Sequence, residues 1–292
     1  MTSPAATRTL PDALRLGAVH VTVTDLERSL DWYQRALGLR ATGAASLGDG
    51  TETLVQLHED RDAQRAGRHA GLYHFALLFR SREELARSVL RVSAAQTPVQ
   101  GMSDHGTHEA VYLPDPDGNG IELAADRPRG RWPTDAYAGG PAPLDLESLL
   151  ETVRGEEPTP AVAEGLRVGH MHLHVGDVDE ALAFYRDVLG FELQANIGSA
   201  AFVSAGGYHH HLAFNVWKGH GVGPAPPHTV GLEHWTVQLP SDQDVADVRA
   251  RLDDAGIPVE QVEAGFRVDD PWRIAVDVVS VPSPELSSGR EQ

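Results

Sequence analysis

The chain has 292 residues, no cysteine and a formal net charge of −18 at pH 7. This length suffices for about two domains with separate cores, and the acidity disfavours nucleic acids and anionic membranes as partners. The absence of cysteine excludes disulfides and restricts any metal site to nitrogen and oxygen ligands. The sequence shows neither a signal-peptide pattern nor an apolar run of about 18 residues, so we expect a cytoplasmic protein without a membrane span.

The first recognisable unit is a strand followed by a helix, in "AVHVTVTDLERSLDWYQRALGL" at residues 18–39. Valines alternate with other residues over 19–23, which is typical of a strand with one buried face. Asp25 is a preferred N-cap for the following helix, and Gly38 is a preferred residue just beyond its end.

The same unit recurs as "HMHLHVGDVDEALAFYRDVLGF" at residues 170–191, displaced by 152 residues. Asp177 occupies the N-cap position again, and Glu180 completes a capping-box pattern with it. The pairs of identical residues at this offset are Asp25 and Asp177, Tyr33 and Tyr185, and Gly38 and Gly190. An internal repeat of this length indicates a duplicated structural unit.

A second repeat links "GLYHFALLF" at 71–79 with "GLEHWTVQL" at 231–239. The stretch "DPDGNGIEL" at 115–123 has a degraded counterpart in "DPWRIAVDV" at 270–278. Together the repeats divide the chain into four βαβββ modules, at residues 16–60, 70–126, 165–218 and 229–281.

We therefore predict an α+β fold in which the four modules form two cup-shaped half-barrel domains. The sequence predicts an N-terminal half at 1–126 and a C-terminal half at 165–283. The segment 127–164 between them is rich in proline and glycine, which is typical of a linker. One short helix is expected there, in "LDLESLLETV".

Strand alternation predicts which side chains face away from the helices, because successive residues point to opposite faces. The apolar residues at 171, 173 and 175 pack beneath the helix, which leaves the intervening histidines on the other face. The residues placed on these faces are His74, Glu122, His170, His172, His174 and His234. A single such histidine is more often a hydrogen-bonded or solvated side chain than a ligand, but its repetition at matched positions favours a shared site.

These modules resemble the vicinal-oxygen-chelate superfamily of glyoxalases, bleomycin-resistance proteins and extradiol dioxygenases. The stretches that carry the resemblance include "GLYHFALLF", "AVYLPDPDGNGIELAADRPR", "VGHMHLHVGDVDEALAFYRDVLGF" and "VSAGGYHHHLAFNVW". More narrowly, they resemble the two-domain bacterial catechol 2,3-dioxygenase type. The resemblance covers most of the chain outside the linker and termini, although the strand–helix motif alone specifies the fold and not the activity.

The resemblance implies three metal ligands per cup. They are the residue seven before the helix-capping aspartate, the histidine of "GLxH" and the glutamate after "DPDGNGI". These positions are Ala18 and His170, His74 and His234, and Glu122 and Ala275. Modules paired in chain order lack one ligand each, modules one and four together retain only His234, and modules two and three together supply His74, Glu122 and His170. We therefore expect cups that combine one module from each half.

For this site the resemblance implies an extradiol dioxygenase that inserts O2 into a small aromatic diol. The implied cofactor is Fe(II), with Mn(II) as an alternative, because two histidines and one carboxylate leave coordination positions open. Chelation by the metal would lower the catechol pKa. No nucleic acid or membrane partner is expected, and a homo-oligomer remains open.

The resemblance also implies acid–base residues. The family pattern H-x-x-A-[L/F] selects His210 within "HHHLAF", and strand alternation predicts that His209 and His211 point to the opposite face. Alternation leaves open the possibility that His211 faces inward instead.

Tyr112 lies ten residues before Glu122, where the family places a tyrosine near the substrate, and a buried core tyrosine is the competing interpretation. His105 resembles a supporting histidine of the family, and His108 is a weaker candidate. His20, His172 and His174 are expected to line cavities. Solvated loop positions are expected for His58, His69, His220 and His228.

Two other functions compete with the dioxygenase hypothesis. A glyoxalase-like isomerase or lyase would need a further ligand, usually glutamate, on the last strand of module three, where this sequence has histidines. A metal-free small-molecule binding or resistance protein would have no reason to keep His74, Glu122 and His170 in register.

Overall fold

The computed structural model describes residues 9–137 and 139–281, and these residues form the four expected modules. Module one contains β1 (Arg15–Val23), α1 (Leu26–Leu37), β2 (Arg40–Ala41), β3 (Ser46–Gly48) and β4 (Thr53–Glu59). Module two contains β5 (Gly71–Phe79), α2 (Arg82–Ala94), β6 (Gly101–Asp104), β7 (His108–Pro114) and β8 (Gly120–Asp126). The predicted α+β class and four-module organisation are confirmed.

The second half repeats this plan. Module three contains β10 (Arg167–His174), α4 (Val178–Leu182), a π-helical turn (Ala183–Val188), β11 (Glu192–Asn196), β12 (Ala200–Ser204) and β13 (Leu212–Asn215). Module four contains β14 (Gly231–Leu239), α5 (Asp242–Asp254), β15 (Glu260–Val262), β16 (Gly265–Asp269) and β17 (Ala275–Ser280). The connecting segment holds a 3-10 turn (Arg129–Arg131), β9 (Ala142–Pro143) and the expected short helix, α3 (Leu146–Glu151).

The described residues form two open, mixed sheets, and each sheet takes one module from each half of the sequence. Modules two and three form the sheet β11-β12-β13-β10-β5-β8-β7-β6-β9, in which β5 and β10 are antiparallel neighbours. Modules one and four form the sheet β15-β16-β17-β14-β1-β4-β3-β2, joined by antiparallel β1 and β14. This is the cross-half pairing that the distribution of histidine and glutamate predicts. We call these the 2–3 cup and the 1–4 cup.

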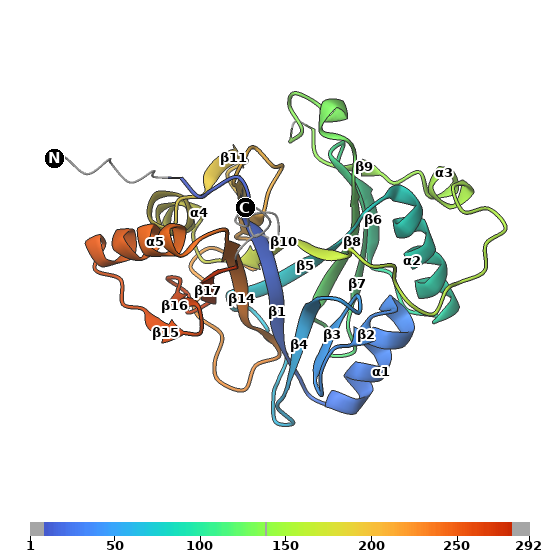
Figure 1. Ribbon diagram of the computed structural model, residues 1–292, viewed down its shortest axis with the longest axis horizontal. Helices are drawn as coiled ribbons and strands as arrows, with labels where there is room; N and C mark the ends of the chain where they lie inside the picture. The colour runs from blue at the N-terminus through green and yellow to red at the C-terminus, as the bar shows by residue number, and fades with distance from the viewer. Residues whose placement is uncertain (1–8, 138, 282–292) are drawn as a thin grey trace, which may run out of the picture.

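The helices follow the halves of the sequence instead. Helices α1 and α2 lie together on one side of the molecule, and α4 and α5 lie on the opposite side (Figure 1). The repeated tyrosines connect modules within each half: Tyr33 Oη donates to Asp115 Oδ2 at 3.2 Å, and Tyr185 Oη donates to Asp270 Oδ2 at 2.9 Å. Strand pairing therefore joins the halves, while each half holds its own two modules together on the helical side.

Local signals in the repeat behave as expected. Asp25 caps α1 by accepting a hydrogen bond from the Arg28 backbone N–H, and Asp177 caps α4 in the same way. Gly38 ends α1 with φ of 74°, a left-handed conformation that favours glycine.

Apolar residues beneath the helices join one large hydrophobic core that reaches both sheets. Its members include Val19, Phe75, Met171 and Trp235, each fully buried at the helix-facing side of a central strand. The opposite strand faces are therefore free to carry polar side chains into the cups. Within the described residues, no helix has the length and apolar character needed to cross a membrane.

Candidate functional site

The candidate site of the 2–3 cup lies on three neighbouring strands, β10, β5 and β8. Ala76 on β5 is opposite Glu122 on one side and His170 on the other, and His74 precedes it by two residues. Since residues two apart share a face, His74, Glu122 and His170 project into the same cup. All three side chains are buried. The sheet thus brings together residues that are 48 or more positions apart in the sequence.

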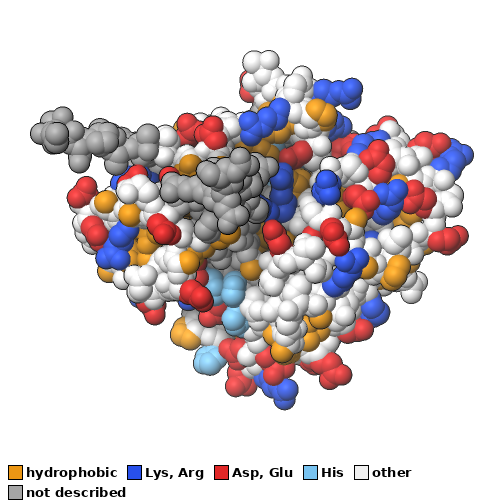
Figure 2. All heavy atoms as spheres, in the orientation of Figure 1, with side chains coloured by type: hydrophobic (Ala, Val, Ile, Leu, Met, Phe, Trp, Pro, Cys, Tyr) orange, Lys and Arg blue, Asp and Glu red, His pale blue; other side chains and the backbone are white. Residues whose placement is uncertain are grey.

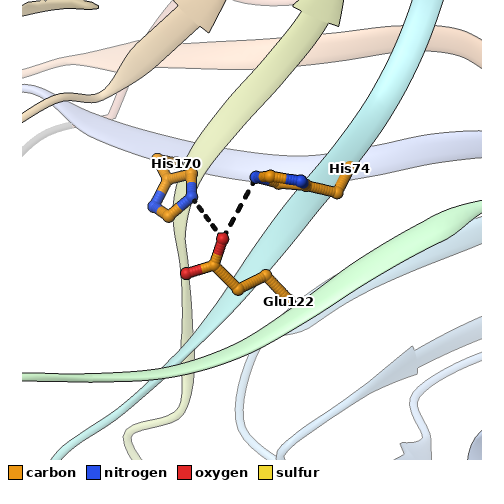
Figure 3. A group of neighbouring side chains, drawn as sticks. All are labelled: His74, Glu122 and His170. Atoms are coloured by element: carbon orange, nitrogen blue, oxygen red, sulfur yellow. Dashed lines mark hydrogen bonds and ion pairs between the residues drawn. The ribbon is translucent and has the colours of Figure 1, made fainter. Parts of the chain in front are cut away.

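The three side chains converge on one carboxylate oxygen (Figure 3). Glu122 Oε2 lies 3.1 Å from His74 Nε2 and 3.2 Å from His170 Nε2. The two imidazole rings are inclined at 69°, with centroids 5.5 Å apart. Both Nε2 atoms therefore face the same oxygen of Glu122 from differently inclined rings.

This arrangement fits a divalent metal. His74 Nε2 is buried and has no hydrogen bond of acceptable geometry among the described residues, although the carboxylate is close. Two ligand atoms that are each about 2.1 Å from one ion lie about 3 Å apart, which matches the nitrogen–oxygen separations here. A buried imidazole nitrogen that faces a carboxylate without hydrogen bonding to it is costly unless a cation completes the contact.

The protonation states also suit metal binding. Burial lowers the pKa of His170, so its ring is neutral and keeps a lone pair. Burial opposes ionisation of Glu122, but the surrounding histidines, His170 above all, hold the pKa of this carboxyl well below its usual range. The cluster therefore presents a negatively charged carboxylate and a neutral His170 ring, the forms of these groups that bind metals.

Tyr112 and His105 lie beside the carboxylate. Tyr112 on β7 is directly opposite Glu122 on β8, and its hydroxyl lies 2.7 Å from His105 Nε2. Burial and the charge of Glu122 raise the pKa of Tyr112, so the phenol stays protonated. Burial, followed by the neighbouring His108 ring, lowers the pKa of His105 to about 4. Tyr112 and His105 are therefore neutral hydrogen-bonding groups beside the three candidate ligands.

His108 is closer to the site than its weak ranking in the sequence implied. Its Nε2 lies 3.2 Å from Glu122 Oε1, and its ring is stacked on that of His105. The signal was present in the sequence, because His108 and Tyr112 are four residues apart on one strand and so share a face.

The three consecutive histidines do not form part of a strand. They lie in the turn that precedes β13, so the alternation used to separate them does not apply, and the expectation that His209 turns away from His210 was wrong. His209 and His210 are both buried, and their Nδ1 atoms are 2.9 Å apart. The His210 ring centroid is 4.2 Å from that of His170. His211 instead accepts a hydrogen bond from the Ala205 backbone N–H at 3.1 Å.

An aromatic rim continues the cup beyond the candidate ligands. Tyr73 contacts the rings of His74, His172 and Trp217, with centroids 4.8 to 5.4 Å apart. Tyr73 and Trp217 are 39% and 51% exposed, so they border the opening rather than the core. Asn215 fixes His172 through a contact of 2.9 Å between its amide nitrogen and His172 Nε2.

Comparison with known proteins identifies the family of this chain. The profile of the Glyoxalase/Bleomycin resistance protein/Dioxygenase superfamily matches residues 15–123 and 167–272. The chain belongs to this superfamily. It is 41% identical over 268 residues to the catechol-2,3-dioxygenase of Bacillus subtilis (strain 168), a match that covers 88% of this chain and 93% of the relative.

Solved structures agree on the superfamily fold. A Bacillus subtilis protein provisionally described as a dioxygenase superimposes with a TM-score of 0.64 at 16% identity, over 92% of this chain and 86% of that one. Glyoxalase I from Zea mays superimposes with a TM-score of 0.54 at 14% identity, over 92% of each chain. At these identities the structural likeness shows the shared fold alone.

The superfamily fold also locates the counterparts of the site in the 1–4 cup. His234 pairs with His20 as His74 pairs with His172, and Asp277 lies opposite Thr236 as Glu122 lies opposite Ala76. The counterpart of Glu122 is therefore Asp277, and the assignment of Ala275 was wrong. The sequence already indicated this match, because Glu122 and Asp277 are equally far from the first residue of "DPDGNGIEL" and "DPWRIAVDV".

The remaining histidines of the 1–4 cup form a stack. The His20 and His234 ring centroids are 3.7 Å apart, and His20 Nδ1 lies 3.0 Å from His58 Nε2. His58 belongs to β4 and is half-buried, so its expected position in a solvated loop was wrong. On the face shown in Figure 2, histidine side chains reach the surface over the adjacent strands β1 and β14.

Proposed function

We propose that this chain is an extradiol ring-cleaving dioxygenase that inserts O2 into catechol-type diols at a non-haem Fe(II) centre, with Mn(II) as the alternative metal. The ligands are His74, Glu122 and His170. The observation that carries the proposal is this buried two-histidine, one-carboxylate cluster in a chain 41% identical to a catechol-2,3-dioxygenase.

The metal, when bound, supplies open positions for the two catechol oxygens and for O2, and lowers the pKa of the diol. The rest of the work falls to the chain's own residues. Both oxygen atoms of O2 enter the ring-opened product as one ring C–C bond breaks, so no external reductant is required. One proton of the diol must be held nearby and returned, which calls for a positioned base.

His210 is the proposed base, because its ring is neutral, buried and next to His170. Tyr112 is a protonated phenol supported by His105, and it is placed to donate a hydrogen bond to a substrate oxygen beside Glu122. Tyr73 and Trp217 provide an aromatic border against which a flat ring can pack. The burial of the surrounding histidines keeps bulk water from the reacting atoms.

A glyoxalase-like isomerase is the second candidate, favoured by the fold shared with glyoxalase I. It is less well supported, because β13 reads Leu-Ala-Phe-Asn over residues 212–215 and offers no carboxylate as a fourth ligand. A metal-free binding protein is disfavoured by the buried His74 nitrogen without a hydrogen bond.

The test is to prepare the protein anaerobically, load it with Fe(II) or Mn(II), and measure metal content before adding catechol and O2. We expect a yellow ring-opened semialdehyde to form with uptake of one O2 per catechol. Conversion of the hemithioacetal of methylglyoxal without O2 uptake would support the isomerase instead. Glu122→Gln serves as the control without activity, and His234→Gln as the control with normal activity.

A further inference from the structure

A chain of hydrogen-bonding groups leads from the end of β8 to His210. It begins at Asp126, four residues after Glu122 on the same strand. Tyr208 Oη donates to Asp126 Oδ2 at 2.8 Å, and His209 Nε2 lies 3.0 Å from Asp126 Oδ1. It continues from His209 Nδ1 to His210 Nδ1 at 2.9 Å.

The charge of Asp126 sets the direction of these hydrogen bonds. Burial is the largest single influence and raises the pKa of Asp126, but the contacts with His209 and the hydrogen bond from Tyr208 together lower the pKa below its usual value. An ionised carboxylate only accepts hydrogen bonds. His209 must therefore carry its hydrogen on Nε2.

The hydrogen on His209 Nε2 in turn determines the hydrogen position on His210. A neutral His209 ring that donates from Nε2 to Asp126 has an acceptor at Nδ1, the atom that faces His210. Of the two facing Nδ1 atoms one must donate, and only His210 can do so. The hydrogen of neutral His210 is then on Nδ1, which leaves a lone pair on Nε2. Within the described residues, His210 Nε2 has no hydrogen-bond partner.

We propose that Asp126 and His209 are positioning residues that fix the tautomer of His210, so that its Nε2 lone pair faces the site and is ready to accept the substrate's hydroxyl proton. This inference rests on the proposed dioxygenase function. A carboxylate that holds one imidazole through another controls which nitrogen is available for chemistry.

A second metal site is the competing use of this region, because His108, Asp126 and His209 lie close together. The orientation of the two histidine rings argues against a metal ion bound by these three residues. The rings of His108 and His209 are stacked at 4.6 Å with an interplanar angle of 16°. Nitrogen lone pairs lie in the ring plane, so nearly parallel stacked rings cannot both point at one ion. Asp126 also has both carboxylate oxygens engaged already.

Among the residues that the structure describes, the 1–4 cup has no equivalent of this chain of groups. By sheet register, the position of Asp126 corresponds there to Val281, which is 44% exposed. The carboxylate is thus found only in the cup that holds the complete ligand set, as a role in that cup's chemistry requires.

The direct test is histidine NMR on the full-length protein loaded with diamagnetic Zn(II). Long-range ¹H–¹⁵N spectra distinguish the two neutral tautomers, and His210→Gln identifies the His210 signals. We expect hydrogen on Nδ1 of His210 in the wild type, and mixed tautomers in Asp126→Ala and His209→Phe. A wild-type ring with hydrogen on Nε2, or a variant spectrum identical to that of the wild type, would overturn the inference.

Steady-state kinetics supply a second test. Asp126→Ala and His209→Phe should each lower kcat for catechol by roughly 10- to 100-fold, part of what a positioned acid–base group contributes. The KM for catechol and the Fe(II) content should stay close to the wild-type values, because neither residue binds the metal. The double variant should lose little more than either single variant, since the residues act as one unit. Asp126→Glu should recover part of the loss.

Asp277→Ala is the matched control, because it removes a histidine-contacting carboxylate from the other cup. It should leave kcat unchanged. Normal turnover in both single variants, or loss of metal with turnover, would contradict the positioning role. If the wild type does not cleave catechol, the proposed function fails, and the NMR measurement still decides the tautomer.

Discussion

The two cups of this protein share a fold and differ at two positions in and beside the proposed metal-ligand set. Both have a histidine at the fourth residue of a central strand, His74 and His234, and both have a carboxylate facing it, Glu122 and Asp277. Where the 2–3 cup has His170, the 1–4 cup has Ala18, the residue 152 positions earlier in the repeat. The counterpart of one proposed ligand is therefore missing.

The second difference is a charge. Tyr112 lies opposite Glu122, and by the same register Arg267 lies opposite Asp277. Arg267 binds both oxygens of Asp277, at 2.6 and 2.9 Å. The guanidinium thus supplies the positive charge that the proposed metal would supply in the 2–3 cup, and it would repel a cation. Burial lowers the pKa of His20 to about 3 and that of His234 to about 4, so these stacked rings are neutral.

The largest expected effect is the difference in metal binding and turnover between variants of Glu122 and of Asp277. Glu122→Gln should abolish Fe(II) binding and reduce turnover by more than about 100-fold, since loss of a direct ligand exceeds the loss of a residue that merely supports one. Asp277→Asn should retain both. Metal content and O2 uptake of the two variants, measured together, test the assignment. Equal loss in both would show that the 1–4 cup also supports catalysis.

The candidate ligand histidines of the 2–3 cup can be compared with His234 of the 1–4 cup in the same way. His74→Ala and His170→Ala should each prevent metal binding, because each removes one of three ligands, while His234→Ala should keep the metal. Metal analysis after loading and desalting is the measurement. Loss of metal from His234→Ala with retention in His74→Ala would place the centre in the other cup.

If these two positions decide the difference, restoring them, together with the longer carboxylate side chain of glutamate, should build a second site. The variant Ala18→His, Arg267→Tyr, Asp277→Glu recreates the ligand set of the 2–3 cup in the 1–4 cup. We expect Co(II) binding to rise from about one to about two ions per chain, because the repulsive guanidinium is gone and three ligands converge. Titration of Co(II) absorbance measures this stoichiometry, with Ala18→His alone as the control that keeps Arg267.

A smaller effect is expected at Tyr112. Tyr112→Phe should lower kcat by roughly 10-fold, since it removes a single oriented hydrogen-bond donor while keeping the ring. Metal content should not change. Its counterpart variant in the other cup, Arg267→Met, should leave kcat near the wild-type value. A metal-depleted Tyr112→Phe protein would instead give the hydroxyl a part in holding the metal cluster together.

The smallest expected effect is on thermal stability. It concerns the buried tyrosine–aspartate pair that each half of the sequence contains. Burial raises the pKa of Asp270 to about 7 despite its hydrogen bonds. The unfolded chain therefore releases this proton first, so the stabilising contribution is complete below about pH 4 and is lost as the pH rises toward 7. Relative to Asp270→Asn, the wild-type Tm should fall by at least about 3 °C between pH 5 and pH 8.

The exposed neighbour Asp269 supplies the control for that measurement, because Asp269→Asn should leave the pH dependence of the wild type intact. A constant Tm difference between wild type and Asp270→Asn across this pH range would show that Asp270 is ionised in the folded protein.

The sequence by itself determined the repeated modules and the faces of their central strands. Alternation is a local property of an extended chain, so the residues around His170 could be assigned to faces without knowing the fold. The resemblance to the superfamily, applied to the repeats, also indicated which modules share a cup, because only modules two and three together supply the three ligands that it implies. Helix caps such as Asp25 and Gly38 were equally readable, since they depend on neighbouring backbone groups alone.

Only the tertiary structure decided the positions of side chains that follow turns or depend on register between distant strands. The histidines at 209–211 precede β13 in a turn, where no periodicity fixes side-chain direction. Contacts with distant or neighbouring groups orient them instead, as Asp126 does for His209. Pairing with β14 identifies Asp277 as the counterpart of Glu122, although equal spacing in the two sequence stretches already indicated this match. Arg267 reaches Asp277 because β16 and β17 are antiparallel. Such contacts arise from packing between strands, so local sequence patterns carry little information about them.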